Sequence, residues 1–219
     1  YPDAKQFVHN VYAFEWGGRR EIFVAALGNP WSSPPALGDG LVRFDRGAAA
    51  FRTGTTVGVS LHLRSAVQQS SEVFYALTQE PPGRRSRLVR LERSGDTLAV
   101  RAVTSLPHRD GGHGGADVLL GREPDTVFCT DRTAGLGKLY FYTYSGGRFR
   151  LAHERETGRH PRYTTVLPNG DVVACNKRDA TLTVFKGLAA SPTSPSISRA
   201  TIPTVPDVSF FIQSRLVPS

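Results

Sequence analysis

The chain has 219 residues, of which 39% are hydrophobic and 21% are charged, and its formal net charge is +8. This composition is ordinary for a globular protein and excludes a disordered or collagen-like chain. No apolar run reaches the roughly 20 residues that a membrane-spanning helix needs, and residues 1–10 carry no signal-peptide pattern, which predicts no membrane partner and a cytoplasmic location.

Strand-like runs bounded by Gly, Pro, Asn or Asp follow one another along the whole chain. A first kind of run starts with an acidic or turn residue and becomes β-branched or aromatic: EIFVAAL (21–27), EVFYALT (72–78), DTVFCTD (125–131) and GDVVACN (170–176). A second run follows each of these, at 41–45, 88–92, 139–144 and 182–187. Third and fourth runs complete most units, among them TLAVRAV (97–103), VSLHLRSAV (59–67) and RYTTVLP (162–168). Helical spacing is nowhere sustained, so the sequence predicts an all-β protein.

The first kind of run recurs at steps of 51, 54 and 45 residues, counted from Ile22 to Val73, Val127 and Val172. A period of roughly 40 to 50 residues with four strands per unit is typical of β-propeller blades, which are apolar on both faces and stack around an axis. We therefore predict one propeller domain over residues 1–219, with about four recognisable blades of four antiparallel strands. A two-sheet sandwich, the all-β alternative, does not predict this repeat.

The two ends of the chain are predicted to share one blade. The run DVSFFIQ (207–213) has the pattern of an innermost strand with no unit after it, and the strands at 21–27 and 41–45 lack an inner partner. Pairing the two ends would close the ring and hide the edges of its sheets. The segment FVHNVYAFEW (7–16) is interpreted as an added edge strand or a cap.

Arginine dominates the basic residues, with 23 Arg against 4 Lys. The excess positive charge suits an anionic partner such as phosphate, a sugar acid or nucleic acid. The alternative is a bias towards arginine spread over solvated loops, which is favoured because no block of five like charges occurs. Nucleic acid ranks below the other partners because no recognised binding module is visible.

Two cysteines, Cys129 and Cys175, each lie within an apolar run. They are interpreted as small buried residues, with a disulfide or redox pair as the alternative. Two thiols alone are too few for a structural zinc site, which needs four ligands. The loop HRDGGHGG (108–115) is interpreted as a connector, with a metal-binding loop as its alternative.

Several motifs occur in a particular order in the second half of the chain: LPHRDGG (106–112), VFCTDR (127–132), GRHPRYTTVLPNGDVVACNKRDATLTVF (158–185) and VPDVSFFI (205–212). In this order the chain resembles the lactonase-type seven-bladed propellers, which include propeller 6-phosphogluconolactonases and carboxymuconate cyclases. Residues 105–213 carry the resemblance well and residues 21–104 more loosely. It implies lactone chemistry without a cofactor or metal, on a small anionic substrate, at one mouth of the central channel.

The resemblance also implies a set of site residues. Arg132 in TDR and Arg162 in HPR match arginines that bind the acid group, whereas the alternative is that both bond to neighbouring loop carbonyls. Glu80 in ALTQE matches a glutamate that handles a proton or water, with a solvated strand-end carboxylate as the alternative. His160 and His113 are the candidate substrate-binding histidines.

Two functions follow from these residues. The first is a lactonase-like enzyme that hydrolyses or forms a sugar-acid or muconate-type lactone, in which Arg132 and Arg162 stabilise the oxyanion and Glu80 moves a proton. The second is a catalytically degenerate propeller that binds a protein partner as a scaffold in a larger assembly. Arginines that converge on one channel mouth near a carboxylate would favour the enzyme.

Overall fold

The computed structural model describes residues 8–28, 40–52, 56–57, 62–80, 83–108, 114–188 and 199–204. All regular elements in these ranges are β-strands, so the predicted all-β class is confirmed. In the same ranges no helix is long and apolar enough to span a membrane. The strands are β1 (Val8–Trp16), β2 (Arg19–Ala26), β3 (Gly40–Asp45), β4 (Ala50–Arg52), β5 (Thr56–Val57), β6 (Leu63–Gln68), β7 (Val73–Thr78), β8 (Arg87–Ser94), β9 (Thr97–Ser105), β10 (Gly114–Leu120), β11 (Thr126–Arg132), β12 (Leu136–Ser145), β13 (Arg148–Arg159), β14 (Pro161–Val166), β15 (Val172–Asn176), β16 (Thr181–Phe185) and β17 (Arg199–Pro203).

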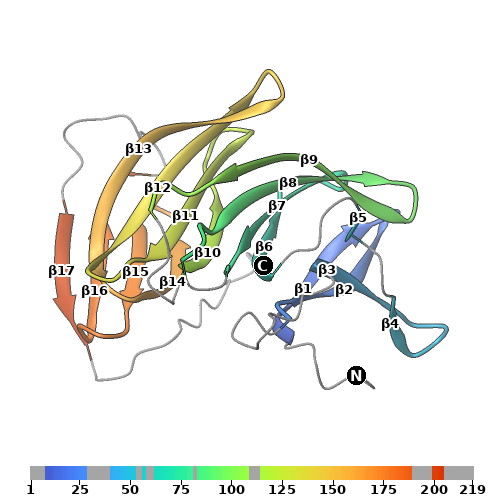
Figure 1. Ribbon diagram of the computed structural model, residues 1–219, viewed down its shortest axis with the longest axis horizontal. Coiled ribbons are helices and arrows are strands. Elements are labelled where there is room, and N and C mark those ends of the chain that lie inside the picture. The colour runs from blue at the N-terminus through green and yellow to red at the C-terminus, as the bar shows by residue number, and fades with distance from the viewer. Residues whose placement is uncertain are drawn as a thin grey trace.

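The strands form four sheets, each built from consecutive segments of the chain. Their orders are β1-β2-β3-β4, β5-β9-β8-β7-β6, β10-β11-β12-β13 and β14-β15-β16-β17. Each sheet contains a four-stranded antiparallel meander, and the second sheet gains a fifth strand because β5 pairs parallel to β9. The sheets follow one another around a common axis as propeller blades, with β1, β6, β10 and β14 nearest the centre (Figure 1). The predicted blades are therefore confirmed, and the sandwich is excluded.

Tight hairpins set the register inside the blades. β1 turns into β2 through Gly17 and Gly18, and β12 turns into β13 through Gly146 and Gly147. All four glycines have positive φ values, between 57° and 79°, as a two-residue hairpin turn of the primed type requires. A side chain at these positions would be strained, so the glycines specify where each strand reverses.

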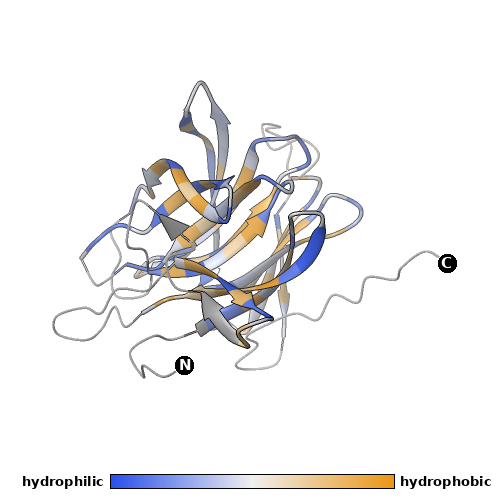
Figure 2. Ribbon diagram, turned by 90° about the vertical axis from the view of Figure 1, so that its right-hand side faces the viewer, coloured by the Kyte–Doolittle hydropathy of each residue, from blue (hydrophilic) through white to orange (hydrophobic). Residues whose placement is uncertain are grey.

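Each middle strand packs against both neighbouring blades because its side chains alternate between the two faces of the sheet. Phe74 and Ala76 of β7 join the hydrophobic cluster with the first blade. Tyr75 and Leu77 of the same strand join the cluster with the third blade. Hydrophobic segments accordingly concentrate in the interior strands of the molecule (Figure 2). This two-sided burial is the physical reason for the repeated apolar runs in the sequence.

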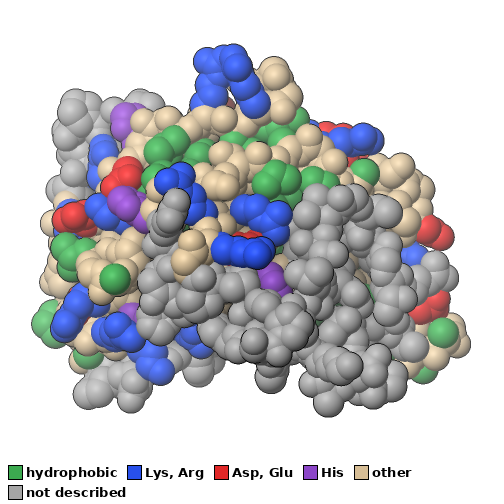
Figure 3. Space-filling view, viewed as in Figure 1, with side chains coloured by type: hydrophobic (Ala, Val, Ile, Leu, Met, Phe, Trp, Pro, Cys, Tyr) green, Lys and Arg blue, Asp and Glu red, His purple; other side chains and the backbone are tan. Residues whose placement is uncertain are grey.

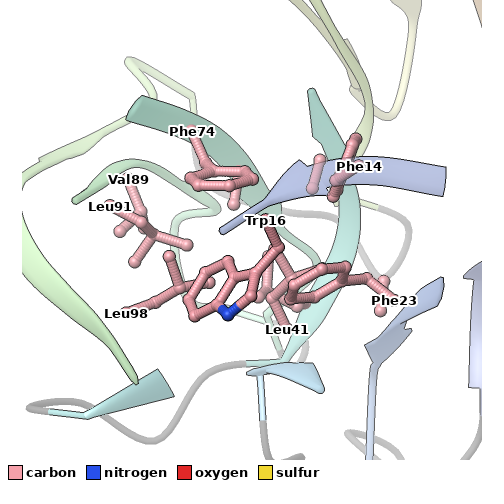
Figure 4. Packing of buried hydrophobic residues seen from close by; sticks show 12 residues of the cluster. Phe14, Trp16, Phe23, Leu41, Phe74, Val89, Leu91 and Leu98 are labelled. Atoms are coloured by element: carbon pink, nitrogen blue, oxygen red, sulfur yellow. The ribbon is translucent and has the colours of Figure 1, made fainter. Parts of the chain in front are cut away.

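The interface between the first two blades is aromatic. Trp16 of β1 is 2% exposed and lies between Phe23 and Phe74, with ring centroids 5.4 and 6.3 Å away (Figure 4). The guanidinium groups of Arg43 and Arg93 lie over the indole at 5.1 and 4.8 Å from its centroid. Aromatic contacts and cation–π contacts therefore both hold these two blades together.

β1 takes the position next to β2 that the sequence assigned to a C-terminal strand. It pairs with β2 from Val8 to Trp16 and supplies the inner strand of the first blade. The segment is therefore a strand, as one of its two interpretations had it, but it is the inner strand of the blade and not an addition to it. The predicted closing strand at 207–213 lies outside the described residues. Cys129 and Cys175 are both buried, as their apolar surroundings predicted.

Candidate functional site

Each of the inner strands β1, β6, β10 and β14 contains one residue that the antiparallel register skips. The skipped residues are His9, Arg64, Ala116 and Arg162, one in each blade. A β-bulge of this kind inserts an extra residue, bends the strand and re-aims the side chain. Every bulge lies near the start of its strand, opposite the end of the second strand of the same blade. The repeat therefore brings four equivalent positions to one end of the propeller axis.

The electrostatics of His9 indicate that these positions converge. Burial is the largest cause that lowers the pKa of His9, to about 3, and the positive charges of Arg64, Arg162 and Arg132 lower it further. The imidazole is therefore neutral at pH 7. Because its four participants come from β1, β6, β14 and β11, this group lies where all four blades meet. We call His9, Arg64, Arg132 and Arg162 the central basic cluster.

Arg64 is the most deeply buried arginine of the cluster, with only 2% of its surface exposed. Its Nε donates to the carbonyl oxygen of Ala116 at 2.8 Å, and its Nη1 donates to Oε1 of Gln79 at 2.8 Å. Its Nη2 is buried and has no hydrogen-bond partner among the described residues. Burial and then the charge of Arg162 lower the pKa of Arg64 to about 10, so it stays charged at pH 7. A buried cation with a spare donor is stabilised by a bound anion.

The two predicted arginines belong to the same cluster but differ in their partners. Arg132 is buried at the end of β11, and it donates from Nε to the carbonyl of Gly114 at 3.0 Å and from Nη2 to that of Gly115 at 3.1 Å. Arg132 thus shows the bonding to neighbouring carbonyls that was the alternative to a ligand clamp. Arg162 is half-buried, and its Nε is buried without a hydrogen-bond partner in the described part of the chain.

Asp117 supplies a carboxylate to this centre and directly follows the bulge in β10. Its Oδ1 accepts hydrogen bonds from Oγ of Ser65 and from the N–H of Val118, both at 3.0 Å, and its Oδ2 accepts the N–H of Thr164 at 3.0 Å. Burial raises the pKa of Asp117 to about 6, against the opposing effect of these hydrogen bonds and of Arg64. Three guanidinium groups therefore act on His9, and one of them, Arg64, also acts on the carboxylate of Asp117.

A repeated hydrogen bond joins each inner strand to the next. The N–H two residues beyond the bulge is bound by a side chain of the preceding blade at three successive junctions. Oη of Tyr12 accepts from Ala66 at 2.9 Å, Oγ of Ser65 accepts from Val118 at 2.8 Å, and Oδ2 of Asp117 accepts from Thr164 at 3.0 Å. These bonds fix the inner strands relative to one another at the depth of the cluster.

Glu80, the predicted proton carrier, is buried just beyond β7 and faces Arg87. Its Oε1 accepts from Nε of Arg87 at 2.8 Å and lies 2.7 Å from Nη2. The residue before it, Gln79, contacts the cluster through Arg64. Because successive side chains of an extended chain point in opposite directions, only one of the two neighbours can face the axis. The carboxylate thus sits in an ion pair at the start of β8.

Of the two predicted histidines, only His160 lies within the described residues. His160 is half-buried between β13 and β14 and has a φ of +57°, which is uncommon for a residue other than glycine. Its carbonyl accepts the N–H of Lys177 at 3.1 Å, and it precedes Arg162 by two residues. His113 lies outside the described residues. No group of three or more His, Cys, Asp or Glu side chains suited to a metal is found among those that are described.

His9 and Arg64 were missed by the sequence analysis. His9 lies in the segment interpreted as an edge strand or cap, and Arg64 lies in a run that was read only for its apolar residues. Aligning the inner strands on their skipped residues places VHN, LRS, GAD and PRY in one column, but the sequence by itself does not mark which residue is skipped. In the view of Figure 3, Lys and Arg side chains are spread over this face of the molecule, and several of them lie near its middle.

No protein-family model matches the sequence, and no curated protein matches it either. Solved structures do match in fold. A proposed 6-phosphogluconolactonase from Bacteroides fragilis superposes with a TM-score of 0.67 at 13% identity, and one from Bacteroides uniformis with 0.67 at 14%. The periplasmic gluconolactonase of Pseudomonas aeruginosa superposes with a TM-score of 0.62 at 16% identity. Each comparison covers 91% of this chain and 55% of the other, so this chain spans about half the length of those proteins.

The chain therefore has the fold of the lactonase-type propellers, and the resemblance stated from the sequence is confirmed at that level. At identities of 13 to 16%, the comparisons establish a shared fold only. The chemistry of this chain has to be argued from the residues of its site.

Proposed function

We propose that the central basic cluster binds a small organic acid or its lactone, and that the protein acts on the lactone bond. One observation carries this proposal. Nη2 of Arg64 and Nε of Arg162 are buried and have no hydrogen-bond partner among the described residues, and the positive charges of the two side chains lie close enough to repel each other. Keeping two like charges together in a buried place costs free energy. A carboxylate or phosphate that accepts from both would remove that cost.

The same donors suit lactone opening. Water attacks the carbonyl carbon of the lactone, a tetrahedral oxyanion forms, and the ring C–O bond breaks to leave an acid and a hydroxyl group. Guanidinium donors that are already held in place stabilise the oxyanion without reorganisation. The proton of the attacking water passes to the departing ring oxygen, and no cofactor is needed for this balance. The reverse sequence forms a lactone.

The fold of the gluconolactonases supports this substrate class as an analogy. A family's fold does not carry its chemistry by itself, and this chain spans 55% of the length of those proteins. The sugar-acid substrate therefore rests on the charges of the cluster. A muconate-type acid has the same anionic recognition group and belongs in the same test.

The alternative function is binding without turnover, as part of a larger assembly. The ion pair between Glu80 and Arg87 favours it, because the glutamate assigned to proton transfer is already engaged. In that case the anion would be a ligand or an acidic group of a protein partner.

The experiment is a hydrolysis assay on a panel of sugar lactones and muconolactones, with and without a phosphate group. The release of acid measures the hydrolysis. Arg162→Met keeps the aliphatic bulk and removes the charge. Arg150→Met, at an exposed position of the outer strand β13, is the matched control. Turnover that Arg162→Met abolishes and Arg150→Met preserves supports the enzyme. Anion binding that Arg162→Met abolishes in a protein without turnover supports the binding module.

A further inference from the structure

We infer that Asp117 is a positioning residue that sets the spacing between Arg64 and Arg162 by tying three inner strands together. The inference deepens the proposed function and rests on it for its ligand. Asp117 itself lies on β10, and its two oxygens reach strands on both sides. One oxygen accepts from Ser65 of β6, and the other accepts from Thr164 of β14.

Both bonds end next to an arginine of the cluster. Ser65 directly follows Arg64 in the chain, and Thr164 follows Arg162 by two residues. Arg64 is also bound to β10 itself through the carbonyl of Ala116, the residue before Asp117. A single carboxylate therefore connects the backbones that carry the two guanidinium groups. Without it, the second and fourth blades would lose this shared anchor.

The charges around Asp117 allow two explanations to be separated. Arg64 of β6 lowers the pKa of Asp117. The carboxylate accepts hydrogen bonds from the hydroxyl of Ser65 and from the N–H of Thr164 on β14. Its charge also acts on Tyr12 of β1. If Asp117 acted only through its charge, removing it would make the cluster more positive and would strengthen anion binding. If Asp117 acts by position, removing it lets the arginines separate and weakens anion binding in spite of the added positive charge.

His9 supplies a readout that needs no ligand. Burial and the charges of Arg64, Arg162 and Arg132 keep its pKa near 3. In Asp117→Ala, positional loss moves the arginines away and raises the pKa of His9. Loss of charge alone leaves that pKa unchanged, because Asp117, with a pKa of about 6, is already protonated where His9 titrates. Nuclear magnetic resonance titration of the His9 ring reports this value for the intact protein.

The experiment compares wild type, Asp117→Ala and Ser65→Ala, in which only the link to β6 is lost. Tyr75→Phe is the matched control, because it removes a contact between the second and third blades, the bond of 2.6 Å from Tyr75 to Asp125, away from the cluster. We expect Asp117→Ala to raise the pKa of His9 and to weaken binding of inorganic phosphate about 10- to 100-fold, Ser65→Ala to do so less, and Tyr75→Phe to do neither.

An unchanged or lower pKa of His9 in both Asp117→Ala and Ser65→Ala would overturn the inference. If Asp117→Ala does not fold, Ser65→Ala decides the matter alone. Failure of the proposed function looks different: wild type would not bind phosphate, gluconate or any lactone of the panel, while the response of His9 to Asp117→Ala would still report on positioning.

Discussion

Nε of Arg64 donates to the carbonyl oxygen of Ala116 at 2.8 Å, so the bulge residue of one inner strand is bound to the bulge residue of the next. The bulges thus have two roles, because they turn charged side chains towards the axis and they expose a carbonyl that holds one of them. Since a guanidinium has five N–H donors, such bonds to the protein can leave others for a ligand.

Arg162→Met is expected to stabilise the protein while it weakens anion binding. The side chain places a charge near Arg64 and has a buried Nε without a partner in the described residues, and both features oppose folding. We expect the free energy of unfolding to rise by about 1 kcal/mol, as is common when a site residue is replaced. Urea unfolding monitored by circular dichroism measures this change. A loss of stability would contradict the idea that Arg162 is kept for binding.

The stability of the protein depends on pH through two groups with opposite effects. The folded protein holds the pKa of His9 at about 3, so the unfolded chain binds this proton more tightly, and stability contributed by His9 is lost as the pH falls from about 6.5 to 3. The folded protein raises the pKa of Asp117 to about 6, so stability contributed by its protonated form is lost as the pH rises from about 4 to 6. The two slopes offset each other between about pH 4 and 6.

Replacing either His9 or Asp117 should therefore expose the effect of the other residue on the pH dependence of stability. Relative to wild type, His9→Asn should become less stable with rising pH from 4 to 6, and Asp117→Asn should become more stable over the same range. Thermal unfolding at a series of pH values measures both differences. Parallel curves for wild type and the two variants would show that neither group titrates as the structure indicates.

Trp16→Ala is expected to cost about 3–5 kcal/mol of stability, the usual cost of removing a buried tryptophan. The indole is 2% exposed, packs on Phe23 and Phe74, and has Arg43 and Arg93 over its ring. Val11→Ala is the control on the same strand, because Val11 is 67% exposed. Chemical denaturation should separate the two variants clearly, and similar losses in both would mean that the first interface contributes little.

Glu80→Gln should lower stability and leave anion binding intact. Its carboxylate is buried and forms a charge-assisted pair with Arg87, while Gln79 contacts Arg64. A double-mutant cycle with Arg87→Gln should give a coupling of about 1–3 kcal/mol. If lactone turnover is found in the wild type and disappears in a well-folded Glu80→Gln protein, the assignment of Glu80 as a proton carrier would be restored.

The sequence alone determined the strands and their repeat, because a strand that packs on two neighbours must be apolar on both faces and its turns need glycine. It also picked out Arg132 and Arg162, whose motifs resemble those of a known family. It did not identify His9, Arg64 or Asp117 as partners of these arginines, since no local pattern marks a skipped residue in a strand. A bulge arises from the pairing of two strands, and its side chain gains a role only when other blades bring their own bulges to the same axis. Tertiary structure alone therefore decided which polar residues meet at the centre.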